Sequence, residues 1–359
     1  MTLPDDDRIL ELVRSYTAVH GSAGHEARVA EHVRARWVGL GVDVGVDGLG
    51  NVIGAVGGRG PRTLVAAHMD EIGFVVRKIT DAGFLLLDVA EGRRRDSIAR
   101  RFAVGQRAVV LGREGVVAEG VFAAASGHII SRRQLESPDL YVDDIFVDLG
   151  VDSRREAEAL GIHVGAAVVW RGETSRLGSK VVAKALDDRM MLVVIDLLLQ
   201  AIDPARLAVE LHVAATVQEE NGFHGARGLV ASRRFDQAVA LDVGLAGDIP
   251  TVDPDEIDNG LGRGPVVAHK DQQVVYSRDV AWQLSDAARR AGVGIQHGVF
   301  PNYGSDGIAF IDAGIPTGLL CTPARYTHTA IEMAALADIR ATVRVLAELC
   351  APGAAPRVA

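Results

Sequence analysis

Two adjacent glutamates, Glu219 and Glu220, follow a run of apolar residues that begins at Val209. β-Branched and small apolar side chains fill both faces of this run, which predicts a buried parallel strand that stops at Gln218. In open α/β sheets, ligands bind just beyond the carboxyl ends of the strands. We therefore expect both carboxylates at a functional crevice, and the alternative is a solvated loop after a strand.

Three predicted strands end in a residue that can bind a metal, and two predicted loops of the same region carry one more each; these residues are His68, Glu220, Asp242, Asp187 and His328. Two imidazoles and three carboxylates form a donor mixture that suits zinc, cobalt or manganese, whereas calcium prefers oxygen alone. If Asp187 bridges two divalent ions, the carboxylates leave only about one positive charge uncompensated. The sequence therefore predicts a site for two divalent ions, most readily zinc.

Asp70 and Glu219 complete the predicted catalytic set. Asp70 follows His68 by two residues, a spacing at which its carboxylate can accept the free imidazole N–H and fix which nitrogen faces the metal. Glu219, next to a predicted ligand, is our candidate for the general base that takes a proton from the attacking water and passes it to the leaving group. Taken singly, each His is also explained as a core residue and each Asp as a helix cap.

Six further histidines lack a companion carboxylate at ligand spacing or lie inside a strand, so we expect structural roles for them. They are His20, His25, His32, His163, His212 and His297. His224 follows the glutamate pair closely enough that it could line the pocket.

Helical and strand patterns alternate before Phe74 and after Ser179, whereas short β-runs punctuated by glycine fill the segment between them. This order of predicted elements indicates one α/β domain, residues 1–73 and 173–359, interrupted by an inserted β-rich domain, residues 74–172. The helices expected in the α/β part are Pro4 to Thr17, His25 to Leu40, Asp188 to Ile202, Arg278 to Ala291 and Ile331 to Leu349.

Composition limits the class of protein. The chain has 359 residues, and its hydrophobic content of 48% and charged content of 24% are typical of a globular protein. A net charge of −9 argues against a nucleic-acid partner. No apolar run is long enough for a membrane span and the N-terminus is acidic, so we expect a cytoplasmic protein with no membrane partner. Cys321 and Cys350 are expected as core thiols, and the basic cluster Arg93 to Arg101 as a solvated or subunit-contact surface.

Six motifs, in order along the chain, resemble those of the TET-type dinuclear-metal aminopeptidases, also called the glutamyl aminopeptidase family. They are HMDEIGFVV from His68, ALDDR from Ala185, VQEENGFHGA from Val217, ALDVG from Ala240, GSDG from Gly304 and RYTHTAIE from Arg325. The chain departs from the family's usual pattern after the glutamate pair, at Asn221, Phe223 and His224, and after ALDDR, at Met190 and Met191. These departures concern pocket shape.

The resemblance implies a zinc-peptidase-like α/β fold, a mixed sheet flanked by helices, with a small β-barrel-like domain inserted for dimerisation. It implies two metals per subunit and a dodecameric tetrahedral shell built from dimers. Carried over by motif, His68 and Asp242 would hold one metal, Glu220 and His328 the other, and Asp187 both. Glu219 would be the general base. Asp70 would bond to a metal ligand without binding the metal itself.

The leading hypothesis is a metal-dependent aminopeptidase that removes N-terminal residues from short peptides with a free N-terminus. A deacylase or amidase acting on small amides would use the same site, and a metal-binding protein without turnover is a third possibility. A glycosidase is disfavoured because its two carboxyl groups must flank a sugar, whereas Glu219 and Glu220 are neighbours. The acidic loop Asp253 to Asp258 either favours basic N-terminal residues or is a solvated turn.

Overall fold

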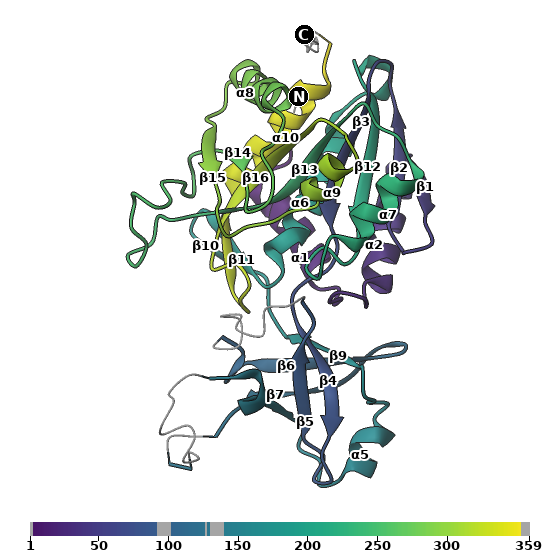
Figure 1. Cartoon of the computed structure of the whole chain (residues 1–359), viewed down its shortest axis with the longest axis vertical. Coiled ribbons are helices and arrows are strands. Elements are labelled where there is room, and N and C mark those ends of the chain that lie inside the picture. The colour runs from purple at the N-terminus through teal and green to yellow at the C-terminus, as the bar shows by residue number, and fades with distance from the viewer. Residues whose placement is uncertain (1–2, 92–101, 126–127, 130–139, 353–359) are drawn as a thin grey trace.

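A computed structural model describes residues 3–91, 102–125, 128–129 and 140–352. Figure 1 shows two units, a large helix-flanked sheet and a smaller barrel joined to one end of it. The basic cluster Arg93 to Arg101 lies outside the described residues. Both cysteines, Cys321 and Cys350, are buried free thiols, as predicted.

The large unit contains an 11-stranded mixed sheet, with the main order β1-β2-β12-β3-β13-β16-β17-β11-β10 and with β14 joining β15 to β16. Strands β12, β3, β13 and β16 are parallel neighbours at its centre. The strands are β1 (Asp43–Val46), β2 (Val52–Gly57), β3 (Arg62–His68), β10 (Ser175–Leu177), β11 (Lys180–Ala183), β12 (Glu210–Thr216), β13 (Gln237–Leu245), β14 (Val266–Lys270), β15 (Gln296–Val299), β16 (Thr317–Arg325) and β17 (Glu332–Ala335).

Helices cover both faces of this sheet (Figure 1). One face packs against α1 (Asp6–Thr17), α2 (Ala27–Gly39), α6 (Leu186–Ala201), α8 (Arg278–Ala291) and α10 (Leu336–Cys350). The other packs against α7 (His224–Ser232) and α9 (Gly307–Asp312). Helix α6 is buried along nearly its whole length, and its residues from Met190 to Leu199 are apolar except for Asp196. Among the described helices, none is both long and apolar enough to cross a membrane.

The smaller unit is a closed six-stranded barrel with the order β4-β5-β8-β7-β6-β9. Phe74, Phe122 and Trp170 pack together inside it, with ring centroids 5.2 to 6.4 Å apart. The mixed sheet with a small barrel confirms the predicted fold class, whereas the domain limits and the dimerisation role of residues 74–172 stay predictions. The barrel elements are β4 (Phe74–Ile79), β5 (Leu85–Val89), β6 (Arg107–Gly112), β7 (Gly115–Ala123), β8 (Phe146–Asp148), β9 (Ala167–Trp170) and the helix α5 (Arg154–Ala159).

Three predicted boundaries are wrong. Strand β12 ends at Thr216 because Gln218 takes a left-handed backbone, with φ of 54°, which is incompatible with a ladder. Strand β13 does not end at Asp242 but continues to Leu245, since β16 pairs with it that far. The last helix begins at Leu336 and not at Ile331, because the residues before it form β17 between β11 and β16.

Candidate metal centre and catalytic cavity

Strands β3 and β13 separate at the candidate site. Their parallel pairing ends with Ala240 opposite Ala66, and β3 stops at His68 while β13 continues beside β16. Extending the register puts Asp242 level with His68 on the neighbouring strand. Both side chains are buried, so the sheet itself sets one imidazole and one carboxylate facing the opening between two strands.

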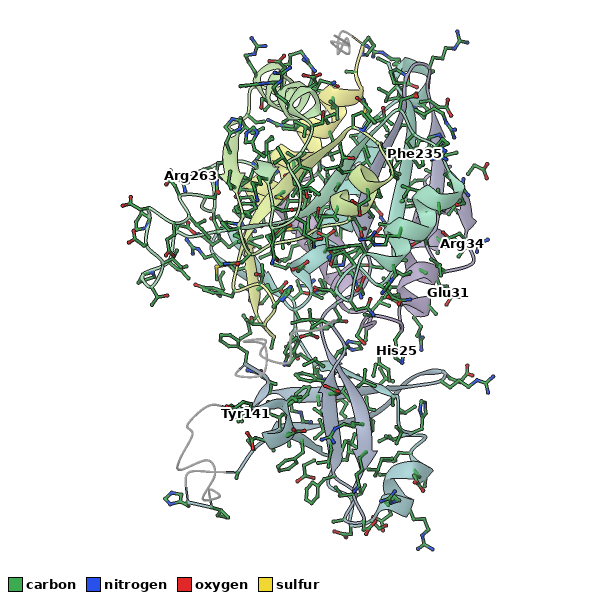
Figure 2. All side chains as sticks on the ribbon, in the orientation of Figure 1. His25, Glu31, Arg34, Tyr141, Phe235 and Arg263 are labelled. Carbon is green, nitrogen blue, oxygen red and sulfur yellow. The ribbon has the colours of Figure 1, made fainter. Side chains whose placement is uncertain are left out.

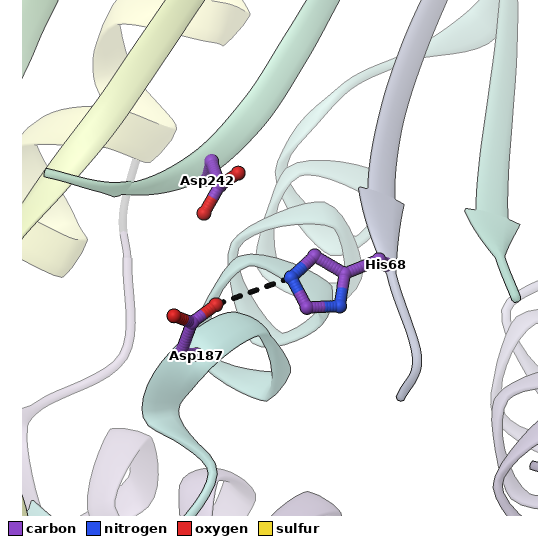
Figure 3. A group of neighbouring side chains, drawn as sticks. All are labelled: His68, Asp187 and Asp242. Atoms are coloured by element: carbon purple, nitrogen blue, oxygen red, sulfur yellow. Dashed lines mark hydrogen bonds and ion pairs between the residues drawn. The ribbon is translucent and has the colours of Figure 1, made fainter. Parts of the chain in front are cut away.

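Asp187, at the start of α6, faces both side chains, and the three form a triangle (Figure 3). Its Oδ1 is 3.1 Å from Nε2 of His68. The backbone of Asp187 and Asp188 departs from helical angles, with ψ of 104° at Asp187. This departure turns the first carboxylate of the ALDDR motif away from the helix and towards the strand ends.

The second oxygen of Asp187 faces a different pair of residues. Oδ2 of Asp187 lies 3.4 Å from Nε2 of His328, and Oε1 of Glu220 lies 3.3 Å from the same nitrogen. The structure thus brings the five predicted ligands together as two triads, His68–Asp187–Asp242 and Asp187–Glu220–His328, that share Asp187. Within each triad the donor atoms lie within 4.8 Å of one another.

These distances suit divalent ions. Two donors each about 2.0 to 2.2 Å from a tetrahedral ion are separated by roughly 3.3 to 3.6 Å. The observed separations are 3.1 Å between Asp187 and His68, 3.4 Å between Asp187 and His328, and 3.3 Å between Glu220 and His328. A carboxylate that directs one oxygen to each triad is the arrangement expected of a group that bridges two ions. The residues present therefore fit a pair of divalent metals.

Glu219 lies next to the triads and lines the same cavity as His68 and Asp242. Its side chain is part of a third cluster with His68 and Glu220, whose donor atoms also lie within 4.8 Å. Burial raises the pKa of Glu219 well above its ordinary value, His68 opposes this, and the carboxylates of Glu220 and Asp242 add to it. Glu219 therefore lies where a proton acceptor beside the candidate metal ligands would be needed.

Asp70 has more contacts than the sequence predicted. Its Oδ1 is 3.4 Å from Nδ1 of His68, and its backbone carbonyl is closer to the same nitrogen at 3.1 Å. The two carboxylate oxygens also accept hydrogen bonds from the backbone N–H groups of Glu219 at 3.0 Å and Glu220 at 3.1 Å. Asp70 thus orients one imidazole and fixes the turn that carries both glutamates.

Glu332 is a positioning residue that the sequence analysis did not identify. It is buried, its Oε2 accepts from the backbone N–H of Asp187 at 2.8 Å, and its Oε1 accepts from that of His328 at 3.0 Å. One carboxylate therefore holds two candidate ligands that are far apart in sequence. It lies within the RYTHTAIE motif, but only its strand position in β17 reveals the role.

Backbone strain is concentrated around the site. Among the described residues other than glycine, the five with positive φ all flank the site or line the cavity: Ala185, Gln218, Phe223, Tyr326 and His328. Such conformations cost about 1 kcal/mol or more each, and they persist where the surrounding contacts enforce them. Their clustering supports a functional role for this region.

The electrostatics of the site favour bound cations. Burial raises the pKa of Asp242 well above its ordinary value, and the neighbouring Asp187 adds to the shift. Burial would also raise the pKa of Asp187, but hydrogen bonds from His328 and His68 outweigh it and lower that pKa. Several buried acids thus share a few histidines as their positive partners. Divalent ions would supply the missing positive charge.

A cavity of about 790 Å³ opens onto the triads. Besides the catalytic candidates, its lining combines aromatic, apolar and amide side chains, among them Phe223, Leu245, Gln272, Asn302 and Tyr303. His224 is not among the lining residues, which contradicts the suggestion that it lines the pocket. The hydroxyl of Tyr303 donates to the carbonyl of Val243 at 2.8 Å, and this bond fixes the part of the cavity lining beside Asp242.

Two other features lie away from this cavity. His25 lies near the start of α2 and faces the barrel, as Figure 2 shows. The loop Asp253 to Asp258 does not line the cavity, and Arg263, labelled at the periphery of the sheet unit in Figure 2, forms an ion pair with Asp258 at 3.3 Å. A preference for basic N-terminal residues set by this loop stays a prediction.

Comparison with known proteins decides the family. Residues 50–345 match the M42 glutamyl aminopeptidase family. The chain belongs to this family. It is 29% identical over 311 residues to a lysyl aminopeptidase of Pyrococcus furiosus, with 84% of this chain and 85% of the relative covered.

Solved structures agree with the assignment. A TET aminopeptidase from a marine-sediment archaeon of the Thaumarchaeota superposes with a TM-score of 0.89 at 28% identity, covering 97% of each chain. The TET1 peptidase of Pyrococcus horikoshii, which can assemble into a tetrahedron or a large octahedral shell, gives a TM-score of 0.85 at 30% identity, covering 96% of this chain and 99% of that one. The chain is therefore a peptidase of the M42 family, whose members are metal-dependent.

Proposed function

We propose that this M42 aminopeptidase removes N-terminal residues from short peptides with two divalent ions and with Glu219 as general base. The observation that supports this most directly is the pair of triads that share Asp187 beside Glu219. His68 and Asp242 would hold one ion, Glu220 and His328 the other, and Asp187 both. When bound, such ions act as Lewis acids on the scissile carbonyl and lower the pKa of the attacking water.

The reacting groups follow from the positions of the side chains. Glu219 takes a proton from the water as the water oxygen attacks the first carbonyl carbon of the peptide. The carbon–nitrogen bond then breaks, and Glu219 returns the proton to the leaving amine. Asp70 keeps Glu219 in place through its bond to the Glu219 backbone N–H.

We also propose that copies of this chain form a dodecameric shell built from dimers, with the sites facing an interior. The likeness to a TET1 peptidase that assembles into a tetrahedron supports this. Confinement in a shell would restrict the substrates to short, unfolded peptides. Zinc as the native metal, with cobalt or manganese as alternatives, and the cytoplasmic location stay predictions.

The principal experiment is the substitution Glu219→Gln. A general base is typically worth about 10² to 10⁴ in rate, so we expect kcat on leucine p-nitroanilide to fall by that factor while about two zinc ions per chain remain. Glu31→Gln, a change on an exposed face of α2, is the matched control and should keep full activity. Full activity of the Glu219 variant would contradict its role as base.

A second experiment separates peptidase from deacylase. We expect hydrolysis of a dipeptide with a free N-terminal amine and no hydrolysis of its N-acetylated form. Cleavage of the acetylated form alone would favour the deacylase. Cleavage of neither by metal-loaded protein would favour a metal-binding protein without turnover.

A further inference from the structure

One acidic residue of the cavity is not used by the mechanism above. Glu91 follows β5, and among the described residues that line the cavity it is the one contributed by the barrel segment. Its side chain is buried, with 8% of the residue exposed, and its Oε2 has no hydrogen-bond partner among the described residues. An unsatisfied buried carboxylate oxygen is costly, which suggests that a ligand completes its hydrogen bonding.

The surroundings of Glu91 favour a cationic ligand. Burial raises the pKa of Glu91 to about 7, the neighbouring carboxylate of Glu220 adds to the shift, and His328 opposes it. The ionised form of a buried acid of this kind is stabilised when a positive charge binds beside it.

The position of Glu91 also indicates which cation. It lines the same cavity as Glu220 and His328, which belong to the triad that includes Asp187, and their charges act on the pKa of its carboxyl group. The α-nitrogen of a peptide is two bonds from the carbonyl carbon that is attacked. A group that binds the α-ammonium must therefore lie beside the metal ligands, whereas a group that binds a lysine side chain would lie several bonds farther away.

We propose that Glu91 is a substrate-binding residue that accepts a hydrogen bond from the α-ammonium group of the peptide and thereby selects free N-termini. The inference rests on the proposed function, because it presumes that the first carbonyl of the substrate lies at the triads. It gives the barrel a direct part in specificity. It also supplies a reason why a site able to cleave small amides would prefer those with a free amine.

The test measures binding without turnover. Zinc-loaded wild-type protein, Glu91→Gln and the control Glu158→Gln, an exposed change on α5, are titrated calorimetrically with three hydroxamates. L-leucine hydroxamate carries the α-amine, 4-methylpentanohydroxamate is the same molecule without it, and L-lysine hydroxamate adds a second ammonium. The hydroxamate group chelates metal in all three, so their differences report the amines.

We expect Glu91→Gln to weaken L-leucine hydroxamate roughly 10- to 150-fold, because the neutral amide lacks the negative charge that strengthens a hydrogen bond from an ammonium group, and to leave the des-amino compound unchanged. The zinc content and melting temperature of the variant should match those of Glu158→Gln. An equal loss for both compounds would indicate a structural role and overturn the proposal, as would no loss for either. A loss confined to L-lysine hydroxamate would assign Glu91 to the side chain and also overturn it.

The same titration separates this inference from the proposed function. If the wild-type protein binds neither leucine compound, the metal centre itself is wrong, and the inference fails with it. If it binds both with equal affinity, only the role of Glu91 fails, because the α-amine then makes no contact that depends on this residue.

Discussion

The two halves of the candidate metal centre are built in different ways. The inner half, His68 and Asp242, stands on neighbouring strands of the central sheet, and these residues are only 2% and 4% exposed. The outer half, Glu220 and His328, stands on loops, and the side chain of His328 is 31% exposed. Asp187 belongs to both halves.

The two halves are also held by different contacts. In the inner half, the backbone N–H of His68 donates to Oδ2 of Asp188, and pairing with β16 keeps Asp242 in place. In the outer half, His328 has a left-handed backbone with φ of 62°, and carboxylates hold the loops: Asp70 binds the N–H of Glu220, and Glu332 that of His328. A site on rigid strands is better preorganised than one on loops, so we expect the inner half to bind its ion more tightly.

The largest effect should come from the residue that the halves share. Asp187→Asn removes a charge from both triads, so we expect fewer than about one zinc ion per chain and a fall in kcat/KM of about 10⁴-fold or more. Elemental analysis and leucine p-nitroanilide hydrolysis measure these outcomes. Asp286→Asn, which alters an exposed ion pair with Arg289, is the control. Retention of two zinc ions by the Asp187→Asn variant would show that Asp187 does not bridge them.

The next effect separates the halves directly. We expect His328→Ala to keep about one tightly bound zinc ion and His68→Ala to lose more metal and more activity, because water replaces a partly exposed ligand more easily than a buried one. Zinc titration with a competing chelator measures both affinities. If His328→Ala weakens zinc binding more than His68→Ala does, the outer half and not the inner half binds its ion more tightly.

A smaller effect is expected from Glu332→Gln. A Gln side chain offers only one carbonyl oxygen, so one of the two bonds to the backbone N–H groups of Asp187 and His328 is lost. We expect the weaker zinc affinity to fall roughly 10- to 100-fold while the tighter one changes less. Glu348→Gln on α10, a partly exposed partner of Arg290, is the control. Equal weakening of both zinc affinities would contradict the expectation that Glu332 mainly supports the weaker site.

The same contrast explains what the sequence could predict. Strand-end residues such as His68 are recognisable because an apolar run stops at a polar side chain, and the central strands came from that pattern. Asp242 was identified although its strand was cut short, since pairing with β16 beyond the end of β3 is a property of the sheet and not of local residues. Glu220 was found by the same strand-end pattern and His328 as a loop residue of the same region, whereas only the motif resemblance indicated that these two would hold the same ion.

The remaining errors have the same physical origin. The residues before α10 have an apolar pattern that fits a helix, but they pair as β17 with strands distant in sequence. This error concealed Glu332, whose two partners are set by tertiary structure alone. Glu91 was likewise invisible, because its place in the cavity depends on how the barrel meets the sheet.

The most direct test is anomalous diffraction from crystals of the zinc-loaded protein. We expect two peaks about 3.5 to 4 Å apart, one contacted by His68 and Asp242, the other by Glu220 and His328, with Asp187 between them. A single peak, or two peaks that do not share Asp187, would contradict it.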